Sequence, residues 1–292
     1  MAILIANKGL SGRFKISGNS TGGFKARYVG VDVEAQAFFS RVTAAGGTLS
    51  ATEQSAIITL VASLKAAGVW TSMKAVYPMV GASAAACAQN LKSSSFTATF
   101  SSGWTFASSG VTPNGTIAYM NTNLTPSVSL IGANFHLSYY SRTNNNAAVD
   151  FDMGVGSDVG AYSSNMFLRR STNDAAFDSG NTSNVRITAS SQINSQGFYV
   201  GSITSISNRV LIKNGSTTLA SSITTAASSL MDSPLFIGAY NQTIFGTPST
   251  NPVNHGSKQC AFSSIGDGLN NTQIGDFYTA VQAFQTTLSR QV

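Results

Sequence analysis

The stretch Arg209–Ser221, with the sequence RVLIKNGSTTLAS, places Asn214-Gly215 between two runs of strand-forming residues. Asn-Gly favours the two positive-φ positions of a type I′ turn, so the stretch predicts a β-hairpin. A two-residue loop also sets the register, which pairs Lys213 with Ser216, Ile212 with Thr217, and Val210 with Leu219. In that register the members of the last two pairs share one face, which is apolar enough to lie on a core.

Further strands and a helix are expected after the hairpin. The next apolar strand is LFIGA at Leu235–Ala239, followed by KQCAFSSI at Lys258–Ile265. A short helix then follows, with Ile274, Phe277, Tyr278 and Val281 on one side. The order of an NG hairpin, the LFIGA strand and AFSSIGDGLNNTQIGDFYTAV resembles the concanavalin A-like and laminin-G jelly-roll superfamily. The resemblance covers roughly residues 95–288 and implies a fold more than an activity.

Composition favours an all-β protein of a particle or cell surface. Charged residues make up 10% of the 292 residues, against roughly 25% in an average soluble domain. Ser, Thr, Asn and Gly take their place, while a hydrophobic content of 42% argues against disorder. Cys87 and Cys260 stand far apart and are interpreted as two free thiols. With no recognisable signal peptide and no apolar run of about 20 residues, we expect synthesis in a host cytoplasm and no membrane partner.

The net charge of +6 is concentrated at the N-terminus. Residues 1–30 contain no Asp or Glu and five basic residues, namely Lys8, Arg13, Lys15, Lys25 and Arg27. The rest of the chain is nearly balanced, with 12 basic and 11 acidic residues. One interpretation is a flexible tail; the other is an arm that becomes ordered on an acidic partner. The strand-like alternation of Arg13-Phe14-Lys15-Ile16 favours the arm, and the five basic residues are its predicted docking residues.

Residues 31–80 form the predicted helical segment. A first helix is expected over Val33–Ala45, and Ser50 with Glu53 form a capping box that begins a second. Apolar residues at helical spacing continue that second helix until Gly68 ends it. A third short helix is predicted over Val69–Val76. So small a helical unit is marginal by itself and is expected to pack on something.

This segment carries a second resemblance. The run EAQAFFSRVTAAGGTLSATEQSAIITLVASLKAAGVWTSMKAVYPMVGASAA begins at Glu34, and FSSGWTFASSGVTPNGTIAYMNT begins at Phe100. Together they resemble virion structural proteins of tailed bacteriophages, notably those that infect Bacteroidetes, in which a small helical segment precedes a jelly-roll domain. Where related proteins usually continue with a charged stretch, this chain has Gly81–Ala88, which is rich in Ala and Ser.

The remaining chain is predicted as a linker and a sandwich. Residues 81–95 are the expected linker, and residues 96–292 the jelly-roll domain with its C-terminal helix. About a dozen short strands are expected at the spacing of a sandwich. The main candidates are Phe96–Phe100, Thr116–Met120, Phe135–Ser141, Ala148–Val155, Val185–Ala189 and Phe198–Ile203.

Glutamates that could serve glycoside hydrolysis are missing from the predicted strands. Such hydrolysis needs two carboxyl groups across a cleft, but the two glutamates, Glu34 and Glu53, both lie in the helical segment. Asp150 and Asp152 are the nearest substitute, in VDFDM, where alternation places both on one face. A solvated outer face explains that pattern best, with calcium or sugar contact as the alternative. We therefore expect no catalytic residues, and keep Asp150 and Asp152 as candidate ligand-binding residues.

Other kinds of site find little support. His136 and His255 have no second histidine at ligand spacing, so no metal or cofactor is expected. Trp104, Tyr139, Tyr140 and Tyr240 have rings suited to stacking on sugars, although strand aromatics more often belong to a core. Arg169-Arg170 is too small a basic patch to indicate nucleic-acid binding.

The sequence therefore predicts a mainly β jelly-roll sandwich preceded by a small helical segment and a basic N-terminal arm. The resemblances imply a non-enzymatic virion protein of the head-fibre, capsid-decoration or tail-appendage kind, located in the virion. On this interpretation the arm docks onto other capsid or tail proteins and the chain forms a homo-oligomer. The alternative is a carbohydrate-binding module that recognises a glycan on the host surface, and both roles are compatible with host attachment.

Overall fold

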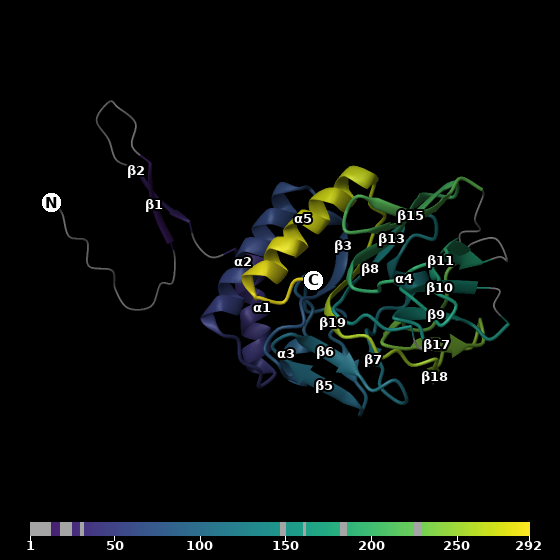
Figure 1. Cartoon of the computed structure of the whole chain (residues 1–292). Coiled ribbons are helices and arrows are strands. Elements are labelled where there is room, and N and C mark those ends of the chain that lie inside the picture. Colours follow the sequence, from purple (N-terminus) through teal and green to yellow (C-terminus); the bar gives the residue numbers. More distant parts are fainter. Residues whose placement is uncertain are drawn as a thin grey trace.

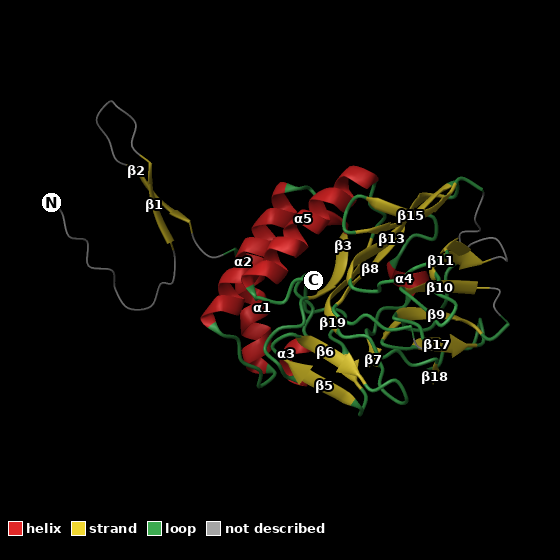
Figure 2. Cartoon of the chain, in the orientation of Figure 1, coloured by secondary structure: helices red, strands yellow, loops and turns green. Residues whose placement is uncertain are grey.

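The computed structural model describes residues 13–17, 25–29, 32–146, 150–159, 162–181, 186–224 and 229–292. Its main body has three layers: helices, an eight-stranded sheet and a nine-stranded sheet (Figure 1). The helices cover one side of the body, and the two mostly antiparallel sheets form a sandwich beside them (Figure 2). The predicted fold class, mainly β with a short helical segment before a sandwich, is confirmed.

The eight-stranded sheet is the middle layer. Its strands run in the order β15 (Thr217–Ser222), β14 (Asn208–Lys213), β13 (Gly197–Ser205), β8 (Phe135–Ser141), β19 (Cys260–Gly266), β6 (Gly110–Pro113) and β5 (Trp104–Ala107), with β3 (Met73–Tyr77) paired to β19. Because β8, β13 and β19 are covered on both faces, every residue of β8 is buried. The sequence predicted β8 with its observed bounds.

The nine-stranded sheet is the outer layer. Its strands run in the order β12 (Arg186–Ala189), β11 (Ala175–Asn181), β10 (Tyr162–Phe167), β9 (Met153–Ser157), β16 (Phe236–Ile237), β7 (Met120–Asn121) and β4 (Thr99–Phe100), with β17 (Tyr240–Thr243) parallel to β9 and antiparallel to β18 (Pro252–Val253). Several of these strands are shorter than the sequence suggested: of residues 96–100, for instance, only Thr99–Phe100 pair.

Three helices form the third layer, on the face of the middle sheet that points away from the nine-stranded sheet: α1 (Val33–Ala44), α2 (Ala51–Ala66) and α5 (Asn271–Thr287). Two single-turn helices, α3 (Ala84–Cys87) and α4 (Pro126–Ser129), lie in connections. The predicted capping box of α2 is confirmed, since the Ser50 hydroxyl accepts from Glu53 N and the Glu53 carboxylate accepts from Ser50 N. None of the described helices combines the length and apolar character needed to cross a bilayer.

The third predicted helix, Val69–Val76, is wrong. Only Trp70–Ser72 makes a 3-10 turn, and the chain then enters the middle sheet as β3. Ala75 and Tyr77 face the space between the sheets, while Met73 and Val76 face the helices. A strand buried on both faces has no polar side, so its pattern resembles that of a buried helix.

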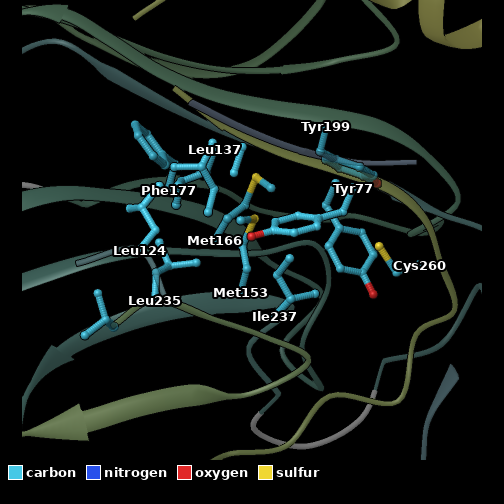
Figure 3. Close-up of a cluster of buried hydrophobic side chains, with 14 of the residues drawn as sticks. Tyr77, Leu124, Leu137, Met153, Met166, Phe177, Tyr199, Leu235, Ile237 and Cys260 are labelled. Carbon is cyan, nitrogen blue, oxygen red and sulfur yellow. The ribbon is translucent and has the colours of Figure 1, made fainter. Parts of the chain in front are cut away.

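Two cores hold the layers together. The first lies between the sheets, where Leu137, Met153, Met166 and Phe177 pack together (Figure 3). The second lies between the middle sheet and the helices, where the Phe277 ring packs 5.0 Å from that of Phe198. The helical segment is thus packed on the sandwich, as expected of a unit too small to stand alone.

The hairpin Asn208–Ser222 differs from the predicted register. Asn214 and Gly215 do adopt positive φ, of 50° and 73°. Lys213 pairs with Thr217, however, and a bulge falls between Leu211 and Ile212. The loop therefore has three residues, and the predicted shared face is wrong. Ile212 faces the helices, whereas Leu219 packs against the core between the sheets.

Residues 81–95, interpreted from the sequence as a linker, contain α3 and several buried side chains. Cys87 and Leu91 are both almost fully buried. The Asn90 side chain accepts from Val76 N and donates to the main-chain oxygens of Lys74 and Ser95. This stretch is therefore bonded to β3.

Candidate functional site

Asp150 and Asp152 do not lie on a solvated face, so that prediction is wrong. Both are 1% exposed and flank Lys258, which is itself fully buried. Lys258 Nζ lies 3.1 Å from Asp150 Oδ2 and 3.6 Å from Asp152 Oδ1. The residues precede β9 and approach the end of the sandwich at which β19 begins. Alternation failed here because the Phe151 position makes only an isolated bridge, to His255, outside any regular strand.

The Lys258 cluster is an internal ion pair network with one cation and two carboxylates. Burial raises the pKa of Asp152 to about 6, although the Lys258 ammonium opposes that shift. Leu168 N donates to Asp152 Oδ2 at 2.8 Å. Asp150 Oδ1 and Asp152 Oδ1 have no hydrogen-bond partner among the described residues. The Lys258 ammonium occupies the position between the carboxylates, and the described residues contain no cluster of three or more His, Cys, Asp or Glu that suits a metal.

The two histidines have hydrogen-bonding neighbours within the sandwich. The His136 ring nitrogens lie 2.6 Å from Asp267 O and 2.9 Å from Ser264 Oγ, and burial lowers the pKa of His136 to about 4. His255 Nδ1 lies 3.0 Å from Ala118 O.

Four of the five predicted docking residues lie on an antiparallel hairpin, β1 (Arg13–Ser17) with β2 (Lys25–Val29). Lys15 and Arg27 are direct partners in its register. Neither strand pairs with a described strand of the two large sheets. The fifth residue, Lys8, lies outside the described residues, and the docking role of all five residues stays a prediction.

One end of the sandwich gathers exposed apolar side chains, and we call it the loop end. It comprises the described parts of residues 122–134, 157–162, 204–208, 222–235 and 243–251. The strand registers bring these loops together: Phe135 pairs with Ile203 in the middle sheet, and Thr243 with Ser157 in the outer sheet. β11 and β17 both point toward this end, on the right of Figure 1.

The exposed apolar residues are concentrated there. Of the eleven large apolar side chains that are strongly exposed among the described residues, seven lie in the loop end. They are Val128, Ile131, Val159, Ile206, Ile223, Ile244 and Phe245. At the opposite end, Ile193 is exposed in a loop. Because contiguous exposed apolar surface can form a binding site, the loop end is the part of the described surface considered as a candidate site.

An aromatic stack forms the most ordered part of the loop end. The Phe245 ring lies 4.1 Å from the Tyr162 ring, with an angle of 13° between the planes. Tyr162 is half-buried and packs against the core between the sheets, whereas Phe245 is 44% exposed. The core therefore supports Tyr162, and Tyr162 supports one face of Phe245.

Polar and aliphatic groups flank the stack. Gly246 N donates to Asp232 Oδ2 at 2.8 Å, while Asp232 Oδ1 is buried and has no hydrogen-bond partner among the described residues. Asp158 N donates to Thr243 O, which brings the β9–β10 loop, with exposed Val159, beside the β17–β18 loop. An exposed aromatic ring held by a second ring suits the flat face of a sugar.

The aromatics considered from the sequence do not form such a surface. Tyr139 and Tyr140 are fully buried and Tyr240 is 7% exposed. Trp104 is half-buried and packs edge-on against Phe100. Sequence reasoning missed Phe245. The usable signal was the pair Ile244-Phe245, two large apolar residues directly before the loop GTPSTNP, which has none.

A separate cavity of about 460 Å³ lies where α2 begins and α5 ends. Its lining is rich in hydroxyls, including Thr48, Ser50, Thr287 and Ser289. The Glu53 carboxylate at its edge is already used by Ser50 and by Gly81 N. The described part of the cavity offers neither an aromatic ring nor an unpaired charged group.

Comparison with known proteins gives architectural likenesses. No protein-family model and no curated protein matches the chain. Among solved structures, domain 4 of AbnA, a GH43 extracellular arabinanase from Geobacillus stearothermophilus in complex with arabinotriose, has 11% identity and a TM-score of 0.46, covering 70% of this chain and 98% of that one. The binding domain of Paraclostridial Mosquitocidal Protein 1 has 12% identity and a TM-score of 0.42, covering 65% and 48%.

The binding domain of Botulinum Neurotoxin DC in complex with SialylT has 13% identity and a TM-score of 0.38, covering 56% of this chain and 39% of that one. These identities are too low to assign the ligands of those domains to this chain.

Proposed function

We propose that this chain is a non-enzymatic carbohydrate-binding protein whose sandwich binds a glycan at the loop end. The observation that carries the proposal is the exposed Phe245 ring stacked on Tyr162. Sugars present a flat face of C–H groups that packs on an aromatic ring, while their hydroxyls seek hydrogen-bond partners. Because Tyr162 fixes the plane of Phe245 before binding, little ordering cost remains when a sugar stacks on it.

The proposal includes no hydrolytic step. Asp150 and Asp152, the carboxylates considered for such a role, are enclosed with Lys258 and have almost no exposed surface. They also lie at the end of the sandwich opposite to Phe245. We expect no sugar release when the chain is incubated with host capsule or cell-wall glycans, and release that is lost in an Asp150→Asn, Asp152→Asn variant would contradict this.

We further propose that the protein is a structural component of a phage particle, as a head fibre, capsid decoration or tail appendage. The arm supports this role, since its hairpin carries Arg13, Lys15, Lys25 and Arg27 and pairs with no described strand of the sandwich. Such an arm is free to bind an acidic surface of another virion protein, which leaves the sandwich for host attachment. A homo-oligomer in the particle is part of this proposal.

Glycan binding is tested with the full chain on an array of bacterial surface glycans, followed by calorimetry on those that bind. Phe245→Ala should weaken binding at least about tenfold, since a central aromatic anchor contributes on the order of 2 kcal/mol. Phe245→Tyr should retain binding, because it keeps the ring. Ile193→Ala is the matched control, an exposed apolar residue at the opposite end. Equal binding by Phe245→Ala, or no glycan bound at all, would overturn the proposal.

A further inference from the structure

The charges of the loop end restrict the sugars it can accept. Asp158 and Asp232 are the charged residues of its loops, and both are acidic. The adjacent Arg209 is 1% exposed, and its guanidinium donates to Ser222 and Thr224. Arg186, at the start of β12, is held by two hydrogen bonds to the Asp178 carboxylate. A sialic or uronic acid placed on Phe245 would therefore meet like charges and no free cation among the described residues.

Two exposed aliphatic residues lie beside the Phe245 position along the chain and in the adjacent loop. Ile244 precedes Phe245 and is 58% exposed, and Val159 in the adjacent β9–β10 loop is 78% exposed. Asp158 N donates to Thr243 O, so the Val159 loop is bonded to the end of β17, which Ile244 and Phe245 follow directly. These side chains offer apolar contact to a group at the rim of a stacked ring. A sugar that is hydroxylated at every carbon would leave this contact unused, or bury a hydroxyl against it without a partner.

From this juxtaposition we propose that the loop end selects neutral 6-deoxyhexoses, whose C6 methyl group packs on Ile244 and Val159 while the ring stacks on Phe245. This inference rests on the proposed glycan binding and adds to it the class of sugar. The preference for these sugars arises from one methyl contact and from repulsion of anions. It can therefore be lost while the ring still stacks on Phe245.

The test uses matched pairs of methyl glycosides that differ only at C6: L-fucose with L-galactose, and L-rhamnose with L-mannose. Burying one methyl group is worth about 0.8 kcal/mol, so the deoxy member should bind about fourfold more tightly. Saturation-transfer NMR should show the C6 methyl protons among the most strongly saturated. N-acetylneuraminic acid and D-galacturonic acid should not bind, and Asp158→Asn should raise their affinity measurably.

Ile244→Thr, at an exposed position that does not support the core, should abolish the preference for the deoxy member of each pair. Equal affinity within each pair, or tighter binding of the acidic sugars, would overturn this inference and leave the proposed function standing. Failure of every glycan to bind would overturn both. Phe245→Ala should weaken both members of a pair equally, because it removes the shared stacking contact.

Discussion

Arg290 Nη1 lies 2.7 Å from the main-chain oxygen of Met79, so the last residues of the chain are bonded to the segment that leaves β3. The same guanidinium donates to the main-chain oxygens of Pro78 and Ala261 and to the Gln285 side chain. Arg290 is 1% exposed, and burial lowers its pKa to about 10. This one side chain joins α5, β19 and the helical segment into a single packed body.

Replacing Arg290 by Met should therefore destabilise the protein strongly. The change leaves several buried carbonyl groups without donors, at about 1–3 kcal/mol for each group left unsatisfied. Urea unfolding should show a loss of about 3–5 kcal/mol, the usual range when one partner of a buried charged network is removed. The control is Arg170→Met, which breaks a partly exposed pair with Asp174 and should cost at most about 1 kcal/mol. Similar losses in the two variants would contradict this role.

The Lys258 cluster predicts an asymmetry between single and multiple substitutions. Lys258→Met leaves two buried carboxylates without their cation and should cost about 3–5 kcal/mol. Adding Asp150→Asn and Asp152→Asn to that variant removes the uncompensated charges and should restore part of the loss. Chemical denaturation of the three proteins measures this directly. If the triple variant is less stable than Lys258→Met, the uncompensated carboxylate charges are not the main cause of the stability loss in Lys258→Met.

Asp152 and His136 should act in opposite directions on stability between about pH 4 and pH 6. The folded-state pKa of Asp152 is raised to about 6, so the folded protein holds a proton that the unfolded chain lacks, and this contribution to stability is lost as pH rises. The folded-state pKa of His136 is lowered to about 4, so the unfolded chain holds the extra proton and stability from this group rises with pH. The two slopes largely cancel in the native protein.

Substitution should uncover each slope. In Asp152→Asn, the free energy of unfolding should rise by about 3 kcal/mol between pH 4 and pH 6.5. The pKa of His136 differs by about 2.5 between the unfolded and folded states, and Asp152 no longer opposes its effect. In His136→Gln, the free energy of unfolding should fall over the same range. Denaturant titrations at intervals of half a pH unit measure both. If the free energy of unfolding changes with pH in the same direction in both variants, Asp152 and His136 do not have opposite effects on stability.

Gly215 is fixed by its backbone and by a neighbouring helix. Its φ is +73°, and a Cβ atom there would lie 2.7 Å from Cβ of Tyr278 in α5. Gly215→Val should cost about 1–3 kcal/mol from the backbone conformation alone, and more from the contact with α5. Gly46→Val isolates the backbone cost, since Gly46 has φ of +82° and nothing within 4 Å of its Cβ position. Equal melting temperatures for the two variants would show that the Tyr278 contact is unimportant.

Deleting residues 1–30 should leave the sandwich folded. Asp32, which accepts from Glu34 N and caps α1, is retained in this truncation. The truncated protein should keep its melting temperature and its glycan binding but fail to join phage particles during assembly. Association of the full chain with isolated particles should weaken as salt increases, because docking depends on the basic residues of the arm. Normal incorporation of the truncated protein would contradict the docking role.

The sequence by itself determined the local features of this protein. The Ser50–Glu53 capping box, the bounds of β8, the positive φ at Asn214 and Gly215, and the apolar side of α5 were all predictable, because each depends on residues within a few positions of one another. The sandwich class followed from the number and spacing of short strands. These signals are local sterics and periodicity, which a single sequence carries.

Tertiary structure decided the rest. Tyr139 and Tyr140 are consecutive and both buried, because helices cover one face of β8 and the outer sheet covers the other. A strand that is buried on both faces shows no alternation of apolar and polar residues in its sequence. Lys258 meets Asp150 across 108 residues, and that pairing alone turns an expected surface carboxylate into a buried one. Phe245 reaches Tyr162 only because β17 runs beside β9. The candidate site exists because chain segments distant in sequence converge at one end of the sandwich.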